Sequence, residues 1–165
     1  MEKNLNGENW RDWFNEWGDR FLLFARQQSG SFQEAEDILQ EVFVHIWTRR
    51  EAFPRIEPGL VFTQIRRKAI DHARSRKRRQ LREKAYAEDT EPPYFTDTAE
   101  PNGDGMQEAL QQLPREQREV LVLKVWGEQT FESIGQTLDI SPNTAASRYR
   151  YGLEQMRRLM KGGKA

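Results

Sequence analysis

The sequence predicts an all-α protein made of two small helical domains joined by a flexible linker. Apolar residues recur three and four positions apart through most of the 165-residue chain, which is the spacing of one face of a helix. Only 36% of the residues are hydrophobic and 32% are charged, so small helical units are favoured over one thick core. Residues 85–108 are acidic, contain prolines and have almost no aliphatic side chains, so they cannot bury enough surface to become ordered.

Charge is segregated along a chain whose formal net charge is zero. Residues 62–84 carry 10 basic and 2 acidic side chains, a net charge of +8, whereas residues 85–108 carry 7 acidic and no basic ones. Separate charged blocks indicate separate surfaces for separate partners, and nucleic acid is the usual partner of a basic block. The predicted organisation is a first domain at 1–84, an acidic linker at 85–105 and a second domain at 106–161.

The first domain is predicted to begin with a helix whose apolar stripe is mostly aromatic. This stripe runs from Trp10 to Ala25 at helical spacing, and we interpret it as core. Gly30 ends the helix. Ser31 and Glu34 then have the Ser-x-x-Glu spacing of a capping box, in which each side chain accepts a hydrogen bond from an unpaired amide of the first turn.

The helix after this cap, from residue 32 to about residue 50, has a core face and an outward polar face. The predicted core face consists of Ala35, Ile38, Leu39, Val42, Ile46 and Trp47. The outward face consists of Glu36, Asp37, Gln40 and Glu41. On periodicity alone, these four side chains form an ordinary solvated surface.

The next predicted helix, residues 60–79, carries most of the basic block. It follows a turn at residues 51–59 that contains two prolines and a glycine. Because its cations sit on an anchored amphipathic helix, they present a fixed surface of the kind that binds nucleic acid. The side chains predicted to face its core are Leu60, Phe62, Ile65, Ala69, Ile70 and Ala73.

The second domain contains a pattern typical of a helix-turn-helix, residues 130–151. Ser141 and Pro142 form a cap and a first helical position between two short helical patterns. The apolar set of the second pattern is Ala145, Tyr149, Leu153, Met156 and Met160. The opposite side, which is predicted to face DNA, carries Asn143, Thr144, Ser147, Arg148, Arg150 and Tyr151. An antiparallel helix pair in an unrelated bundle is the alternative.

Composition argues against several classes of protein. The chain has no cysteine, so it contains neither disulfides nor thiolate sites. Its two histidines lack ligand partners at metal-site spacing, so we expect no metal and no cofactor. A glycine-rich phosphate loop and a recognisable catalytic constellation are both missing, which argues against an enzyme. Without a long apolar run or a signal core, the protein is expected to be cytoplasmic and not inserted in a membrane.

Three stretches together resemble bacterial RNA polymerase sigma factors of the extracytoplasmic-function group, in the sigma-70 family. EAEDILQEVFVHIW, Glu34 to Trp47, resembles the helix of sigma region 2 that docks on the clamp helices of the polymerase β′ subunit. FTQIRRKAIDHARSRKRR, Phe62 to Arg79, resembles the following part of region 2, which opens and reads the −10 element. Residues 113–159 resemble region 4, which binds the −35 element.

The resemblance implies roles for surfaces that periodicity alone leaves as solvated. It implies that Glu36, Asp37, Gln40 and Glu41 bind core polymerase, and that region 4 also meets the polymerase β flap. It implies that the turn at residues 51–59 forms a wall for a flipped −10 base and that the basic helix holds melted promoter DNA. It also implies an anti-sigma factor as a regulatory partner. The residues expected to contact the −10 region are Phe53, Arg55, Arg66, Arg67, Lys68, Asp71, Arg74, Arg76 and Lys77.

The main alternative function is a one-component helix-turn-helix transcriptional regulator. It would account for the second domain but leave residues 32–79 as an unexplained effector domain. Such a regulator would usually be a dimer that reads a palindrome.

Overall fold

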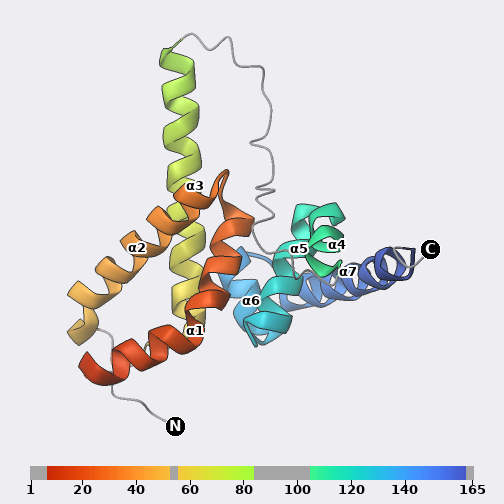
Figure 1. The fold of residues 1–165 in the computed structure, drawn as a ribbon, viewed down its shortest axis with the longest axis horizontal. Helices are drawn as coiled ribbons and strands as arrows, with labels where there is room; N and C mark the ends of the chain where they lie inside the picture. The colour runs from red at the N-terminus through yellow and green to blue at the C-terminus, as the bar shows by residue number, and fades with distance from the viewer. Residues whose placement is uncertain (1–6, 53–55, 84–104, 163–165) are drawn as a thin grey trace. The chain divides into compact units, whose positions relative to one another are not determined.

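A computed structural model describes residues 7–52, 56–83 and 105–162 of the protein. Every regular element in these ranges is a helix, which confirms the all-α prediction (Figure 1). The chain divides into two compact units, Met1–Phe95 and Thr96–Ala165, each with its own core. None of the helices in the described part combines the length and the apolar character needed to cross a bilayer.

The first unit is a bundle of three helices, with a single 3₁₀ turn before the third. The helices α1 and α2 pack against each other, and both pack against α3. The elements are α1 (Gly7–Gln28), α2 (Phe32–Thr48), the 3₁₀ turn η1 (Arg50–Ala52) and α3 (Pro58–Arg82).

Aromatic rings fill the centre of this bundle. Phe21 and Phe24 on α1 are fully buried, and the ring of Phe62 on α3 lies 5.0 Å and 5.5 Å from theirs, edge to face. Trp10 stacks on Trp13 at 5.7 Å. Aromatic pairs of this geometry contribute about 0.5–1.5 kcal/mol each beyond the area that they bury. The aromatic stripe predicted for α1 is therefore a core stripe, as expected.

The predicted capping box at the start of α2 is confirmed, with one difference. The Glu34 amide donates to Ser31 Oγ at 3.1 Å, as in the standard box. The Glu34 carboxylate accepts from the Gly30 amide at 2.8 Å, one residue earlier than the cap itself. This carboxylate also forms an ion pair with Arg76, at 3.2 Å, and lies 3.7 Å from His72 Nδ1. Glu34 therefore connects the α1–α2 turn to α3.

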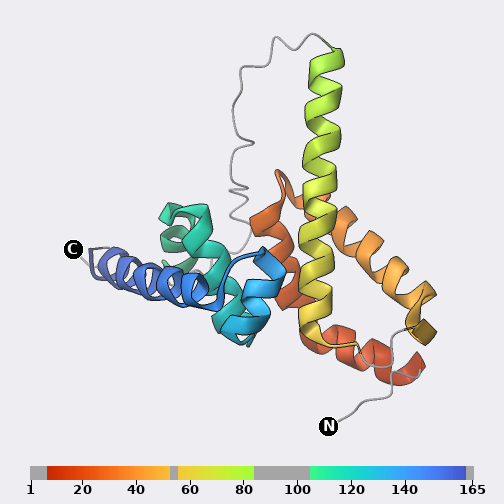
Figure 2. The ribbon, with the colours of Figure 1, turned by 180° about the vertical axis from the view of Figure 1, so that it is seen from behind.

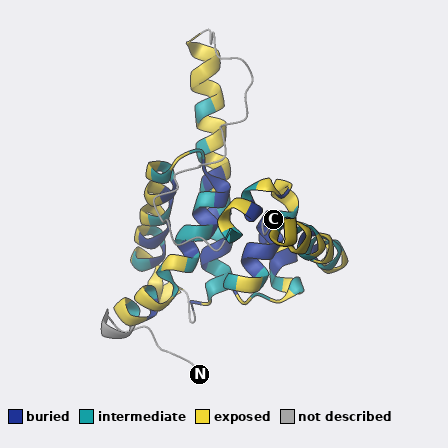
Figure 3. Cartoon of the chain, turned by 45° about the vertical axis from the view of Figure 1, so that its right-hand side comes forward, coloured by how far each residue is buried: buried dark blue, intermediate teal, exposed yellow. Residues whose placement is uncertain are grey.

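The prediction that Ile70 and Ala73 face the core is wrong. Both are exposed, whereas Val61, Phe62 and Ile65 on the same helix are fully buried. Ile70 lies outside the buried stripe because it follows the buried Ala69, and successive helical residues point about 100° apart. Ala73 lies closer to the end of α3 that runs past the other helices, and Figure 3 shows that far end almost entirely in the colour of exposed residues. The core face of α2 differs less: Phe43 is buried, while Leu39 and Trp47 are half-buried.

The second unit is built around one long helix, α7 (Pro142–Gly162), which packs against α4, α5 and α6. Figure 2 shows this blue helix lying against the green and cyan helices. The other elements are α4 (Met106–Gln112), α5 (Arg115–Leu121), the π-helix η2 (Val122–Trp126) and α6 (Phe131–Leu138).

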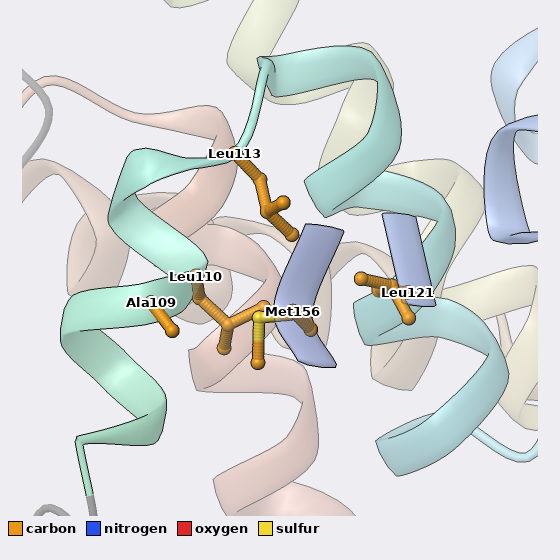
Figure 4. Close-up of a cluster of buried hydrophobic side chains, with 5 residues drawn as sticks. All are labelled: Ala109, Leu110, Leu113, Leu121 and Met156. Atoms are coloured by element: carbon orange, nitrogen blue, oxygen red, sulfur yellow. The ribbon is translucent and has the colours of Figure 1, made fainter. Parts of the chain in front are cut away.

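Apolar side chains from α4, α5 and α7 meet in a core cluster (Figure 4). Leu110, Leu121 and Met156 are 2%, 2% and 8% exposed. Met160, predicted on the apolar side of α7, does lie on the side of Leu153 and Met156, but it is 36% exposed. It lies one turn beyond Met156, close to the end of the helix, where fewer neighbours cover it.

Candidate nucleic-acid interface

Hydrogen bonds at the helix ends fix where the two helices of the helix-turn-helix in the second unit begin and end. At the start of α6, the Ser133 amide donates to the hydroxyl of Thr130 at 3.1 Å. At the end, Asp139 takes the left-handed conformation with φ 57°, and the amides of Asp139 and Ile140 both donate to the Gly135 carbonyl. This is the arrangement by which a helix terminates and its chain reverses.

The second helix then begins at the predicted cap. The Thr144 amide donates to Ser141 Oγ at 3.1 Å, and the Ser141 hydroxyl donates to Thr144 Oγ1 at 2.8 Å. The turn is tight enough that a Cβ on Gly135 would lie 2.6 Å from the Ile140 carbonyl oxygen. Glycine at this position therefore permits the close approach of α6 to the start of α7.

All six residues predicted to face DNA in this unit lie on the first three turns of α7. Arg150 and Tyr151 are exposed, and the Arg150 guanidinium lies 5.7 Å from the Tyr151 ring centre. The buried side of the helix, with Ala145 and Gly152, faces away from them. The remaining members are Asn143, which is exposed, and Thr144, Ser147 and Arg148, which are half-buried. Short polar groups thus come first and cations later, as a groove-binding helix requires.

The predicted DNA contacts on the basic helix α3 fall into two groups. An anchored group is engaged within the unit: Arg66 donates to Gln28 Oε1 at 3.1 Å, and Arg76 pairs with Glu34. An outward group is exposed to solvent. Lys68 belongs to neither group and is half-buried. The outward group consists of Arg67, Asp71, Arg74 and Lys77. The predicted contacts Phe53 and Arg55 lie outside the described residues, as do residues 85–104 of the predicted linker.

The four polar residues predicted to form the outward face of α2 are all exposed. Glu41 Oε2 lies within hydrogen-bond distance of His72 Nε2, at 3.1 Å, which ties one edge of this face to α3. Sequence reasoning missed one member of the face, Val44, which is 63% exposed. It falls three and four positions after Glu41 and Gln40, so the same helical spacing that predicted the polar members could have found it.

The second unit also has an apolar groove, with a volume of about 640 Å³, between α4, η2 and α7. Its walls include Met106, Val125, Trp126 and Leu153, with Lys161 at one end. Within the described ranges, no group of three or more His, Cys, Asp or Glu side chains is placed to hold a metal ion. The surfaces found are thus a basic helix, a capped helix-turn-helix, a polar helix face and an apolar groove.

Comparison with protein families assigns both units. Residues 13–79 match Sigma-70 region 2, and residues 104–156 match Sigma-70, region 4. The first match covers α2 and most of α3, so it accounts for the stretch that a one-component regulator would leave unexplained.

Individual relatives agree with this assignment. The chain is 36% identical to the RNA polymerase sigma factor CarQ of Myxococcus xanthus, over 97% of this chain and 95% of that protein. It is 28% identical to the ECF RNA polymerase sigma factor SigE of Mycolicibacterium smegmatis, over 90% of this chain and 60% of that protein. The fold resembles that of the sigma factor RpoE from Bartonella quintana, solved in complex with the anti-sigma factor NepR. That likeness has a TM-score of 0.66 at 21% identity and covers 92% of this chain and 98% of RpoE. The chain therefore belongs to the sigma-70 family of RNA polymerase sigma factors, in the extracytoplasmic-function group, and directs promoter-specific transcription initiation without being an enzyme.

Proposed function

We propose that this sigma factor docks on core RNA polymerase through the polar face of α2. The observation that carries the proposal is the contrast between the two sides of this helix. Ala35, Ile38 and Ile46 are fully buried, while the opposite side exposes polar side chains throughout its first two turns. That docking face comprises Glu36, Asp37, Gln40 and Glu41. Its fixed position on a packed helix suits a partner with basic side chains, because complementary charges orient and accelerate docking.

We assign the −10 element to α3. Its outward cations, Arg67, Arg74 and Lys77, lie along the exposed part of a helix that is anchored at its other side, with Asp71 between the first two. A rigid row of cations can follow the phosphates of a displaced strand, which is the main requirement for holding melted DNA. The anchored pair, Arg66 and Arg76, contributes chiefly by fixing α3 against α1 and α2.

We assign the −35 element to the first three turns of α7. The Ser141 cap leaves the helix N-terminus open to solvent, and Asn143, Ser147 and Arg148 follow within two turns. These are the turns that reach base edges when a helix of this motif enters the major groove. Tyr151 and Arg150 extend the surface toward the phosphates.

Two further partners follow from the same assignment. The apolar groove between α4, η2 and α7 is a suitable seat for the polymerase β flap, because its walls are mostly apolar. An anti-sigma factor is the proposed regulator, since RpoE, whose fold is similar, was solved with one. A protein that works on core polymerase acts in the cytoplasm, which is where we place this one.

The test is a binding titration and a run-off assay with the full chain and core polymerase. Asp37→Arg combined with Gln40→Ala should abolish docking and transcription, because reversing a charge at a hydrogen-bonded interface costs a few kcal/mol. The matched control is Asp12→Arg combined with Asn15→Ala, an exposed pair with the same spacing on α1. An ordinary surface change costs about 0.5 kcal/mol or less, so the control should bind normally.

Three outcomes would contradict the proposal. RNA synthesis by the isolated chain would show that it does not depend on core polymerase. Unchanged affinity of the α2 double variant for core polymerase would show that the outward face of α2 is an ordinary solvated surface. An equal loss in the α1 control would show that any charge reversal on this unit disturbs binding, so that α2 is not the specific contact.

A further inference from the structure

The docking face of α2 continues into an exposed apolar side chain at its C-terminal end. In the described parts of α1 and α2, Val44 is the one large hydrophobic residue classed as exposed, at 63%. It lies seven, four and three positions after Asp37, Gln40 and Glu41, so all four side chains share one side of the helix. At 1.5 Å per residue, Val44 is about 10 Å along the axis from Asp37.

The surroundings of Val44 offer a partner little that is polar. The Thr48 hydroxyl is one turn further on, and it already donates within the helix, 2.9 Å from the Val44 carbonyl and 3.1 Å from the His45 carbonyl. Trp47 is half-buried, and its ring is held in place by Trp10 at 5.6 Å and by the Arg50 guanidinium at 4.2 Å. The face is therefore polar in its first two turns and apolar in its last.

A single exposed valine is common on protein surfaces and by itself indicates nothing. Val44 differs because it directly continues, one turn after Gln40 and Glu41, a polar surface that we assign to a protein partner. Interfaces typically combine apolar side chains that lose their water with polar side chains that give orientation. The packing of Trp47 also fixes the neighbouring surface, so little ordering is needed when a partner binds.

We propose that Val44 is the apolar anchor of the docking face, and that the polymerase surface seated on α2 presents an aliphatic side chain to it. Basic groups of that surface would lie toward Glu41, about one turn away, and Asp37, about two turns away. The inference rests on the proposed function, because it names a contact within the same interface. It adds that docking has a component that does not depend on charge.

The two components respond differently to salt. Charges on an exposed face are screened over about 10 Å at 0.1 M salt and about 3 Å at 1 M salt. Burial of an apolar side chain is not screened in this way. Loss of Asp37 should therefore matter less as salt rises, whereas loss of Val44 should matter equally at every salt concentration.

The experiment compares Val44→Thr, Val44→Ile and Asp37→Asn in the full chain, titrated with core polymerase at 0.1 M and 0.5 M salt without DNA. Threonine keeps the shape and branching of valine but adds a hydroxyl, which should weaken binding about tenfold at both concentrations. Isoleucine keeps the apolar surface and should bind as tightly as the natural chain. The effect of Asp37→Asn should shrink at the higher salt. Leu81→Thr is the matched control, since Leu81 is 72% exposed on α3, and it should not change the affinity.

The outcomes separate the inference from the proposed function. If the α2 double variant loses binding but Val44→Thr does not, the anchor is overturned and the docking face stands. The anchor is also overturned if the loss from Val44→Thr disappears at 0.5 M salt, or if Leu81→Thr produces the same loss. If neither the double variant nor Val44→Thr weakens binding, the docking face itself is wrong. Because Val44 is exposed and threonine has a similar helix propensity, circular dichroism should show an intact fold in each variant.

Discussion

Gly135 allows a sharp test of how the helix-turn-helix is held together. It lies within α6, where alanine would ordinarily stabilise the helix by about 1 kcal/mol. The structure predicts the opposite for Gly135→Ala. The added Cβ would lie 2.6 Å from the Ile140 carbonyl oxygen, whereas ordinary contacts are 3.4 Å or longer. This oxygen belongs to the backbone, so it cannot move aside as the end of a flexible side chain can.

The expected cost combines three effects. Relieving the contact requires the Ile140 peptide to move, and overpacking of this kind costs about 2 kcal/mol. The next residue is Ser141, so the same movement weakens the cap of α7, at about 1 kcal/mol. The higher helix propensity of alanine returns about 1 kcal/mol. We therefore expect Gly135→Ala to destabilise the second unit by about 2 kcal/mol, roughly a 30-fold change in its unfolding equilibrium.

Hydrogen exchange of the full chain, followed by mass spectrometry, measures the stability of each unit separately. Peptides from α5, α6 and α7 of Gly135→Ala should exchange about 30-fold faster, and peptides from α1, α2 and α3 should be unchanged. Gly18→Ala is the control in the first unit. Its Cβ would meet the Phe14 ring at an ordinary 3.6 Å, so this change should slow exchange slightly. The effect of Gly152→Ala on the exchange rate should lie between those of the other two variants, because its Cβ would lie 3.0 Å from the flexible end of the Leu121 side chain.

Slower exchange in α6 and α7 of Gly135→Ala would refute this reasoning. It would mean that helix propensity outweighs the contact and that the turn has room for a methyl group. Faster exchange in both units would show that the substitution acts on the whole chain and not on the turn.

Three other substitutions test the assigned surfaces. Arg148→Ala should weaken −35 binding by about 1–3 kcal/mol if Arg148 reads a base, or reduce the salt slope of binding by about one if it holds a phosphate. Arg158 lies about 15 Å further along α7, so Arg158→Ala should weaken binding less. Equal losses in a fluorescence-anisotropy titration would argue against the first turns of α7 as the part that reads DNA. Arg74→Ala should weaken binding of single-stranded −10 DNA and reduce the salt slope by about one, and an unchanged slope would remove it from the DNA contact. Ser31→Ala should destabilise the start of α2 by about 1 kcal/mol, visible as faster exchange of its first turn, and unaltered exchange there would mean that the cap contributes nothing.

Features with a local cause could be predicted from the sequence. Ser31 and Glu34 begin α2, and Ser141 with Pro142 begins α7, because a cap depends only on residues within one turn. The same holds for the sidedness of α2, where helical spacing identified the exposed polar face. These local signals, together with the charge segregation, were enough to predict the all-α fold class and the position of the surfaces, whereas the roles proposed for those surfaces depend on the resemblance to sigma factors.

Features that depend on distant parts of the chain could not be predicted. Periodicity identifies the apolar side of α3 but neither the width nor the length of the strip that α1 and α2 cover, which is why Ile70 and Ala73 were misplaced. Arg66 and Gln28 are 38 positions apart, and nothing near either residue indicates their hydrogen bond. Among the predicted DNA contacts, the sequence could not distinguish side chains that face solvent from those that fasten α3 to the bundle.

The far end of α3 has a consequence for how this helix responds to its surroundings. Beyond Arg76, which pairs with Glu34, the turns are supported mainly by their own backbone, so their helicity is governed by a helix–coil equilibrium and not by packing. Arginine, lysine, glutamine and leucine favour the helical state there. However, Arg74, Arg78 and Arg82 follow one another at four-residue spacing, and each such pair of like charges opposes the helix by about 0.2–0.5 kcal/mol. Counterions relieve that repulsion, and so would the phosphates of a bound strand. We therefore expect the number of helical turns at this end to increase with ionic strength, so that the length of α3 depends on its ionic environment.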